Sequence, residues 1–274
     1  MNKIKGHIRK TYFGDLLRHL KLKIESHLPY EDGHLGFLFR GNSEMKRGTF
    51  DQDLLEFLRE KFPLYNKNFI DVGAHQGYFT CFANANKVKR VFAVEPDKIN
   101  YSFLSKNVAK NEFKDKTECY NMGLSQVTGY LDLYGFSTGV SVFENWGGSS
   151  SKRKIRVKAD TFDRQFQEIL PLRDSIVKID VEGFELEVIK GATKAIASAV
   201  RTIFIVEISL PSNLLKTGSH VAEVLKFFQR NGYAMAIFVN KNGNPSSMNY
   251  SELGKIVKLL ETFQSLNFIF EKQS

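Results

Sequence analysis

The fold is decided by the stretch Asn68-Phe69-Ile70-Asp71-Val72-Gly73-Ala74-His75-Gln76-Gly77-Tyr78-Phe79-Thr80. Its first five residues predict a buried strand, and the glycines after them predict a sharp turn into a helix. Gly73 and Gly77 let the backbone approach a ligand closely, and the free N–H groups at the start of the helix suit polar ligand atoms. The stretch therefore predicts a nucleotide-type site at the end of a buried strand.

Outward from this stretch, strands and helices alternate, which is typical of a parallel sheet covered on both faces. Strands are expected at 68–72, 90–95, 117–122, 176–181, 202–208, 233–239 and 265–270. Helices are expected after Gly77 and at 97–111, 161–169, 184–197 and 219–230. We therefore predict an α/β fold with a mostly parallel seven-stranded sheet flanked by helices, in which the last two strands form a hairpin-like pair.

The segment 126–157 breaks this alternation. Residues 130–134 and 154–157 look like strands, and the Gly- and Ser-rich stretch 137–151 separates them. We predict a β-rich insertion between strands three and four. Its loop is interpreted either as a lid in which Trp146 stacks on a sugar face or as an ordinary surface loop.

Residues 1–63 are expected to form an N-terminal helical extension that makes one compact unit with a domain at 64–274. Apolar residues recur at helical spacing between Thr11 and His27, with Lys and Arg between them, and a second helix is expected at 52–62. The first helix is amphipathic and basic. We favour its packing on the core, and docking to an acidic partner or to a membrane surface is the alternative.

The composition is that of a packed globular chain, because 42% of the 274 residues are hydrophobic and neither glycine nor proline is enriched. The net charge of +9 favours acidic partners, although the spread of Lys and Arg along the chain fits an ordinary basic surface. Cys81 and Cys119 are the only cysteines, which argues against a disulfide framework or a cysteine-based zinc site. With no apolar run long enough to span a membrane and no secretion signal, a cytoplasmic location is expected.

Glu95 ends the second strand, where its carboxylate would lie beside the glycine turn and accept hydrogen bonds from both ribose hydroxyls. The fingerprint G-x-G-x-x-G is absent because three residues separate Gly73 from Gly77, so a pyrophosphate cradle is disfavoured. S-adenosylmethionine has no phosphate, and Asp71 at the start of the turn can orient its zwitterionic methionine end. These residues favour S-adenosylmethionine as the ligand.

A third element, Lys178-Ile179-Asp180-Val181-Glu182-Gly183-Phe184-Glu185, lies at the end of the fourth strand. Ligands of open parallel sheets sit beyond such strand ends. Asp180 and Glu182 are therefore expected to face the reacting groups. The acidic residues Glu185 and Glu187 lie in the first turn of the helix that follows, and their favourable interaction with its dipole explains their presence there.

The stretch from Asp71 to Phe79 and the element from Lys178 to Glu185, together with Val94-Glu95-Pro96, resemble the FkbM family of methyltransferases. The resemblance covers about residues 52–210, and Asp180-Val181-Glu182-Gly183-Phe184-Glu185 is its most specific part. It implies a class I methyltransferase Rossmann-like fold, S-adenosylmethionine as the cofactor, and a hydroxyl group of a sugar, glycan or natural product as the methyl acceptor. It also implies that Met122-Gly123-Leu124-Ser125 lies against the adenine.

The expected cofactor-binding residues are Asp71, Gly73, Ala74, His75, Gly77, Tyr78, Phe79, Glu95, Pro96, Gly123, Leu124 and Asp180. Methyl transfer from a sulfonium to an oxygen is an in-line displacement, and Asp180 or Glu182 is the candidate general base for the alcohol proton. His75 lies inside the cofactor turn and is interpreted as a residue near the cofactor rather than as the base. Asp180 and Glu207 could share a divalent cation, but two carboxylates are an incomplete ligand set, so no metal site is predicted.

Two other functions stay open. An RNA methyltransferase would suit the basic N-terminal helix, but no Asn-Pro-Pro-aromatic element follows the fourth strand to hold a planar amine, so nucleic acid is disfavoured. A non-catalytic cofactor-binding module would have no need of buried carboxylates at Asp71, Glu95, Asp180 and Glu182. The expected partner is therefore a small-molecule or glycan acceptor.

Overall fold

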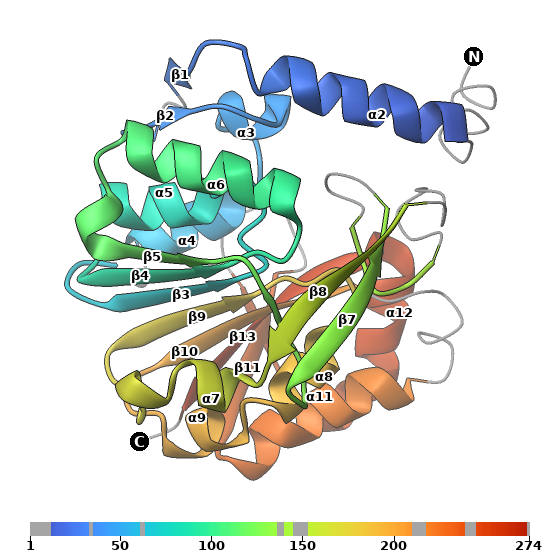
Figure 1. Cartoon of the computed structure of the whole chain (residues 1–274). Coiled ribbons are helices and arrows are strands. Elements are labelled where there is room, and N and C mark those ends of the chain that lie inside the picture. Colours follow the sequence, from blue (N-terminus) through green and yellow to red (C-terminus); the bar gives the residue numbers. More distant parts are fainter. Residues whose placement is uncertain are drawn as a thin grey trace.

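The structure is a computed structural model that describes residues 12–32, 35–60, 64–135, 140–144, 153–209, 218–238 and 245–272. Its main sheet consists of β3 (Asn68–Val72), β4 (Arg90–Val94), β5 (Thr117–Tyr120), β9 (Ser175–Ile179), β10 (Ile203–Ser209), β11 (Tyr233–Ile237), β12 (Ser246–Met248) and β13 (Ser265–Lys272). Across the sheet they lie in the order β12-β11-β13-β10-β9-β3-β4-β5 (Figure 1). The five strands from β10 to β5 are parallel, while β13 runs antiparallel to both of its neighbours.

The strand order reverses at β3. β4 and β5 continue from β3 toward one edge of the sheet, and β9 and β10 lie on its other side. In register, Asp71 of β3 lies between Ala93 of β4 and Lys178 of β9. Open α/β sheets bind ligands beyond the carboxyl ends of the strands at such a switch point. The topology therefore brings the acidic strand ends to the edge of the sheet where a ligand binds.

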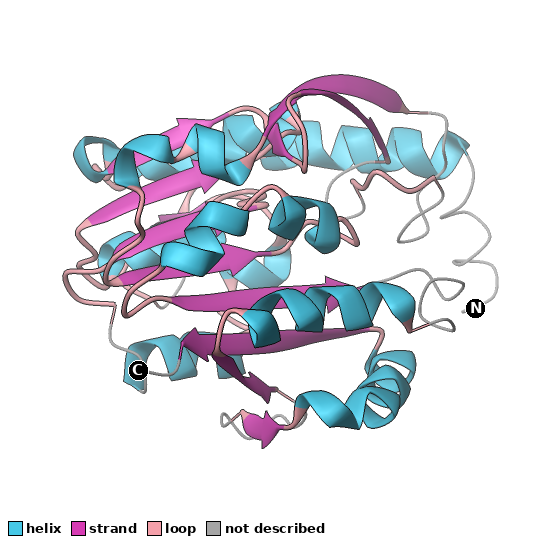
Figure 2. Ribbon diagram, turned by 90° about the horizontal axis from the view of Figure 1, so that it is seen from below, coloured by secondary structure: helices cyan, strands magenta, loops and turns pink. Residues whose placement is uncertain are grey.

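Helices cover both faces of the sheet (Figure 2). They are α4 (Gln52–Glu60), α5 (Tyr78–Ala85), α6 (Lys98–Lys110), α7 (Phe162–Gln165), α8 (Glu185–Lys190), α9 (Thr193–Ser198), α11 (Ser219–Arg230) and α12 (Leu253–Phe263). Two large apolar clusters bury most of them: one joins α4 and α5 to the sheet, and the other joins α7, α8, α9, α11 and α12 to the opposite face. A smaller cluster holds Leu104 and Val108 of α6 against Ala93 of β4.

Three charged side chains lie on the sheet face that carries α4 and α5. Side chains alternate between the faces of a strand. Phe69, Ile176 and Ile205 belong to the α4–α5 core, so the residues two positions later in each strand share that face. These residues are Asp71, Lys178 and Glu207 on the adjacent strands β3, β9 and β10.

A second sheet lies between β5 and β9 in the chain. It consists of β6 (Gly123–Leu124), β7 (Gly129–Tyr134) and β8 (Lys154–Asp160) in the order β6-β8-β7. Its two long strands form an antiparallel ribbon that stands beside the main sheet (Figure 1). The loop predicted to join them, with Trp146, lies mostly outside the described residues.

The N-terminal segment consists of α2 (Tyr12–Glu25), β1 (Glu31–Asp32), β2 (Leu38–Phe39) and α3 (Ser43–Lys46). The extension predicted to be helical thus also contains a two-stranded sheet of β1 and β2. Phe37, Phe39 and Met45 enter the same apolar cluster as Tyr78 of α5. One side of α2 faces the protein and another faces solvent: Leu22 is buried, whereas Leu17, Leu20 and Ile24 are exposed.

The main sheet and its helices differ from the prediction at three further places. The main sheet has eight strands instead of seven, because β12 adds to the edge of β11. The helix expected at 184–197 is broken into α8 and α9 at Gly191, where a Cβ atom would lie only 2.1 Å from the carbonyl oxygen of Ser125. β11 and β13 do pair antiparallel, but β12 and α12 lie between them in the chain.

Within the described ranges, no helix combines the length and the apolar character that crossing a membrane requires.

Candidate active site

A cavity of about 240 Å³ opens at the switch point of the sheet. Every residue predicted for the cofactor or for catalysis lines it, except Gly77. Their proposed roles stay predictions. The structure adds lining residues that the sequence did not connect with the site, among them Met45, Phe50, Asn100, Leu131, Leu133 and Lys178.

The glycine turn owes its two glycines to the packing of the protein itself. Gly73 has a φ of 86°, and a Cβ atom there would lie 1.8 Å from the carbonyl oxygen of Asp180. Gly77 also has a φ of 86°, and a Cβ atom would lie 2.7 Å from Leu104 Cδ1 on α6. Close approach of a ligand was the predicted reason for both glycines. The structure adds a second reason, which is close approach of the Asp180 carbonyl after β9 and of Leu104 on α6 to the turn, and the ligand-based reason stays a prediction.

Glu95 lies just beyond β4 with its carboxylate held by the backbone. Its Oε2 accepts a hydrogen bond from the His75 N–H and its Oε1 accepts one from the Asp97 N–H, both at 2.8 Å. Burial raises the pKa of Glu95 to about 8, with the charge of Asp97 adding to the effect. Each carboxylate oxygen has a second lone pair, so the group can accept further hydrogen bonds from a ribose.

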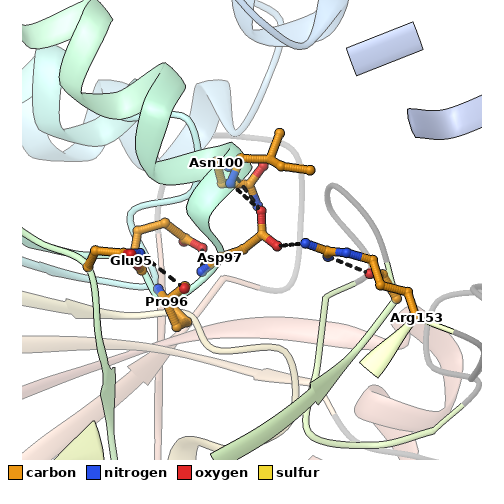
Figure 3. A network of polar contacts seen from close by, with 8 residues as sticks. Glu95, Pro96, Asp97, Asn100 and Arg153 are labelled. Atoms are coloured by element: carbon orange, nitrogen blue, oxygen red, sulfur yellow. Dashed lines mark hydrogen bonds and ion pairs between the residues drawn. The ribbon is translucent and has the colours of Figure 1, made fainter. Parts of the chain in front are cut away.

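The segment after Glu95 is fixed by a network of polar contacts (Figure 3). Asp97 is buried and caps α6 by accepting hydrogen bonds from the N–H groups of Ile99 and Asn100. The other oxygen of its carboxylate accepts a hydrogen bond from the Arg153 guanidinium at 2.5 Å. Arg153 also donates to the Gly135 carbonyl at 2.8 Å. The ends of β7 and β8 are thereby tied to the segment that carries Glu95.

His75 is held in the turn with a φ of 51°. Burial lowers its pKa to about 4, so the ring is neutral at neutral pH. Both ring nitrogens are shielded from solvent, and neither has a hydrogen-bond partner among the described residues. A neutral imidazole offers one donor and one acceptor. His75 can therefore contact a ligand in the cavity through a neutral ring.

Asp71 is buried beneath the turn. Its carboxylate accepts a hydrogen bond from the Thr80 hydroxyl at 2.6 Å. Burial raises the pKa of Asp71, and the positive charge of Lys178 opposes that rise. Asp71 thus links β3 to α5 from within the wall of the cavity.

Lys178 is a buried cation that pairs with one carboxylate and is influenced by three further acidic side chains. Its Nζ lies 2.7 Å from Asp180 Oδ2 and 4.5 Å from the centre of the Phe79 ring. Burial alone would lower the pKa of Lys178, but the negative charges of Asp180, Glu207, Asp71 and Asp51 outweigh it, so its pKa is raised. Lysine is almost never fully buried unless it is paired. Lys178 therefore stays charged and anchors Asp180 at the edge of the cavity.

Two further carboxyl groups surround this ion pair. Burial raises the pKa of Glu207 well above its usual value, and the charge of Asp180 raises it further. Burial also raises the pKa of Asp51, which lies in the turn before α4. Together with Asp180 they make this end of the cavity acidic around a single buried cation.

Glu182 and Glu185 shape the turn after β9. Glu182 has a φ of 53°, and its backbone carbonyl accepts a hydrogen bond from the Ser141 hydroxyl at 2.7 Å. Glu185 is buried, and its Oε1 accepts a hydrogen bond from the Gly183 N–H at 2.9 Å. Burial raises the pKa of Glu185 to about 8. The helix dipole, which was the predicted reason for Glu185, does not explain this burial, whereas a role in closing the turn does.

Sequence reasoning missed Lys178 and Asp51 as parts of the site. A lysine within the otherwise apolar strand Ser175–Ile179 is a signal that a buried carboxylate must lie nearby. Asp51 carries no comparable signal, because only the packing of the N-terminal segment brings it close. Among the residues that the structure describes, no group of three His, Cys, Asp or Glu side chains is arranged to hold a metal ion.

Comparison with known proteins identifies the family. Residues 71–235 match the model of the Methyltransferase FkbM domain. Methyltransferase sdnD from Sordaria araneosa is 27% identical over 186 residues, which are 54% of this chain and 69% of that protein.

Two crystal structures are also similar. A methyltransferase FkbM from Methylobacillus flagellatus is 15% identical with a TM-score of 0.45, and the match covers 79% of this chain and 47% of that one. This chain therefore spans about half the length of that relative. An O-methyltransferase from Bacillus cereus in complex with SAH is 11% identical with a TM-score of 0.47, and the match covers 94% of this chain and 91% of that one. On the family match over residues 71–235, which is more than half of its length, this chain belongs to the FkbM methyltransferase family.

Proposed function

We propose that the protein transfers the methyl group of S-adenosylmethionine to a hydroxyl group of a sugar, a glycan or a natural product. The observation that carries this proposal is the position of Glu95 and Asp180. They follow β4 and β9, the two neighbours of β3, and both line the cavity that the turn at Gly73 borders. One carboxylate is thus available on each side of the turn, the first for the cofactor and the second for the acceptor.

The Glu95 side of the cavity suits the adenosine part of the cofactor. Its carboxylate can receive the ribose hydroxyls, while Gly123 and Leu124 of β6 offer a small and an apolar surface to the adenine. Asn121 donates hydrogen bonds to the carbonyl oxygens of Glu95 and Pro96 and so holds this segment in place. When bound, the cofactor supplies a methyl group on a positively charged sulfur.

The Asp180 side suits the removal of a hydroxyl proton. Methyl transfer to the acceptor oxygen would leave the electron pair of the broken carbon–sulfur bond on sulfur and would release the hydroxyl proton. Asp180 can take that proton, because its carboxylate lies at the cavity and Lys178 holds it by an ion pair. General base catalysis of this kind contributes about 10²- to 10⁴-fold to a rate.

The charge of the acceptor end favours a neutral substrate. Asp180 and Glu207 line the cavity, with Lys178 as the cation between them, and Phe50 and Phe184 supply aromatic surface. The Asp180 carboxylate repels phosphate groups, both carboxyl groups can accept hydrogen bonds from hydroxyl groups, and aromatic rings pack on the apolar face of a sugar. This arrangement supports a polyhydroxylated acceptor over RNA.

The test is transfer of labelled methyl from S-adenosylmethionine onto separate pools of neutral saccharides, lipid-linked glycans, hydroxylated natural products, peptides and RNA. We expect an alkali-stable methyl ether in one of the hydroxyl-bearing pools. Asp180→Asn should bind the cofactor as the wild type does and lose at least about 100-fold in turnover. Glu187→Gln on α8, where Glu187 pairs with Lys190, is the matched control and should retain turnover. Label in the RNA pool alone, or undiminished turnover by Asp180→Asn, would contradict the proposal.

A further inference from the structure

The outward face of α2 carries an apolar stripe. Leu17, Leu20 and Ile24 are 45%, 45% and 62% exposed, and their spacing of three and four residues places them along one side of the helix. Leu22, which points to the opposite side, is only 3% exposed. The helix therefore packs through Leu22 and leaves the stripe on the surface. Figure 1 shows α2 running along the outside of the molecule.

Exposed apolar side chains are concentrated in this segment. In the part of the chain that the structure describes, nine large hydrophobic side chains are exposed, and four of them are Leu17, Leu20, Ile24 and Leu28. Single exposed apolar residues are normal on a protein surface, but a contiguous group marks an interaction site. The remaining five are spread over residues 38–263.

Basic side chains flank the stripe. Successive residues of a helix are rotated by about 100°, so Lys21 lies on one side of the stripe and Lys23 on the other. Both lysines are exposed, and Lys21 forms a long ion pair with Glu25 at 3.5 Å. In the sequence, residues 1–27 contain seven Lys and Arg against two Asp and Glu. The stripe is thus set in a strongly positive segment.

The end of α2 is fixed to the body of the protein. The Arg40 guanidinium donates a hydrogen bond to the Ser26 carbonyl at 2.9 Å and stacks on the Tyr30 ring at 4.0 Å. The Tyr30 hydroxyl in turn donates to the Lys106 carbonyl of α6 at 3.3 Å. These contacts attach the end of α2 to the domain, so a surface that binds α2 holds the whole protein.

We propose that α2 docks this protein on an anionic membrane surface, independently of the function proposed above. An amphipathic helix with aliphatic residues on one face and lysines at its borders lies in the interface plane of a bilayer, with its apolar face among the acyl chains and its lysines at the lipid phosphates. A second copy of the chain fits less well, because two such positive segments repel each other and three aliphatic side chains bury far less than the roughly 800 Å² per partner of a stable dimer.

The test is co-sedimentation of the full chain with vesicles of phosphatidylcholine, with and without phosphatidylglycerol. We expect binding only to the anionic vesicles, and weaker binding at higher salt. Ile24→Asp should reduce the affinity at least about tenfold. Lys21→Glu combined with Lys23→Glu should reduce it at least about 25-fold, since each basic residue near the surface contributes about fivefold. These positions are exposed, so the variants should keep the melting temperature and the cofactor affinity of the wild type.

Matched controls lie elsewhere on the surface. Val127→Asp changes an aliphatic side chain that is 63% exposed, and Lys255→Glu changes a lysine that is 62% exposed on α12. Both controls should bind vesicles as the wild type does. The proposal is overturned if the wild type does not bind anionic vesicles or if the α2 variants bind them as well as the controls do. It is also overturned if the wild type forms a dimer without lipid and Ile24→Asp dissociates that dimer.

Discussion

Arg153 and Asp97 form an ion pair with an N–O distance of 2.5 Å, in which the Asp97 side chain is 1% exposed and the Arg153 side chain is 16% exposed. Asp97 caps α6 two residues after Glu95, and Arg153 directly precedes β8. The pair therefore joins the cofactor side of the cavity to the second sheet, whose residues Leu131 and Leu133 form another part of the wall.

Arg153→Gln should weaken both the protein and its cofactor site. Loss of the guanidinium leaves the buried Asp97 without its cation, which lowers the free energy of unfolding by about 3 kcal/mol. Because Asp97 also donates its N–H to Glu95, we expect the affinity for S-adenosylmethionine to fall as well. Urea denaturation and calorimetry measure the two effects.

Arg156→Gln is the control for that substitution, because Arg156 lies nearby on β8 and pairs with Asp132 at the surface. An exposed pair of this kind adds little stability. The proposed role of the Arg153–Asp97 pair would be wrong if Arg153→Gln and Arg156→Gln had the same effect on the free energy of unfolding and on the cofactor affinity.

Gly73→Ala should destabilise the protein, because the added methyl group would meet the Asp180 carbonyl at 1.8 Å in a backbone conformation with a φ of 86°. The expected loss is about 3 kcal/mol in the free energy of unfolding. Gly254→Ala, in the exposed first turn of α12 with no neighbouring atom within 4 Å, should instead gain about 0.5 kcal/mol. A Gly73→Ala protein that melts with the wild type would contradict the observed approach of β9 to the turn.

The fold could be predicted wherever the periodicity of the sequence is strong. The expected bounds of β3 and α11 agree with the structure at every residue, because apolar residues at the spacing of a buried strand or an amphipathic helix are a direct signal. β12 gave no such signal, since its three residues Ser246–Met248 are mainly polar and form an edge strand. α12 was overlooked because two strands that pair antiparallel were expected to be joined directly, although Ile256 and Leu260 have helical spacing.

The site was predictable only as far as it lies at strand ends. Glu95 and Asp180 follow strands that the sequence defines, and their convergence is a consequence of a parallel sheet. Arg153 could not be identified, since its partner lies 56 residues earlier in the chain. Asp51 and Glu207 reach Lys178 from the N-terminal segment and from β10, and that meeting depends on tertiary packing.

The pH dependence of stability should reveal the buried Glu185. Its pKa is raised in the folded protein to about 8 from 4.5, so the protonated form is favoured by folding. The stabilisation is complete below the unfolded pKa and is lost as the pH rises through the folded pKa. From about pH 5 to about pH 8 the group should lower the free energy of unfolding by up to about 1.4 kcal/mol per pH unit.

Glu95, whose pKa is also about 8, acts in the same direction, so Glu185→Gln should remove only part of the slope. The amide oxygen of that variant can still accept the Gly183 N–H. Urea denaturation across this pH range measures the slope, with Glu187→Gln on the same helix as the control. A slope that Glu185→Gln leaves unchanged would show that Glu185 titrates normally.

The central claim is that the carboxylate of Glu95 holds the ribose of S-adenosylmethionine. Its most direct test is calorimetric titration of S-adenosylmethionine into the wild type and into Glu95→Ala, with circular dichroism to establish that both are folded. We predict that the wild type binds the cofactor and that the variant binds it at least about 30-fold more weakly, because two hydrogen bonds to the ribose are lost. Equal affinity in the two proteins would contradict the assignment of this cavity to the cofactor.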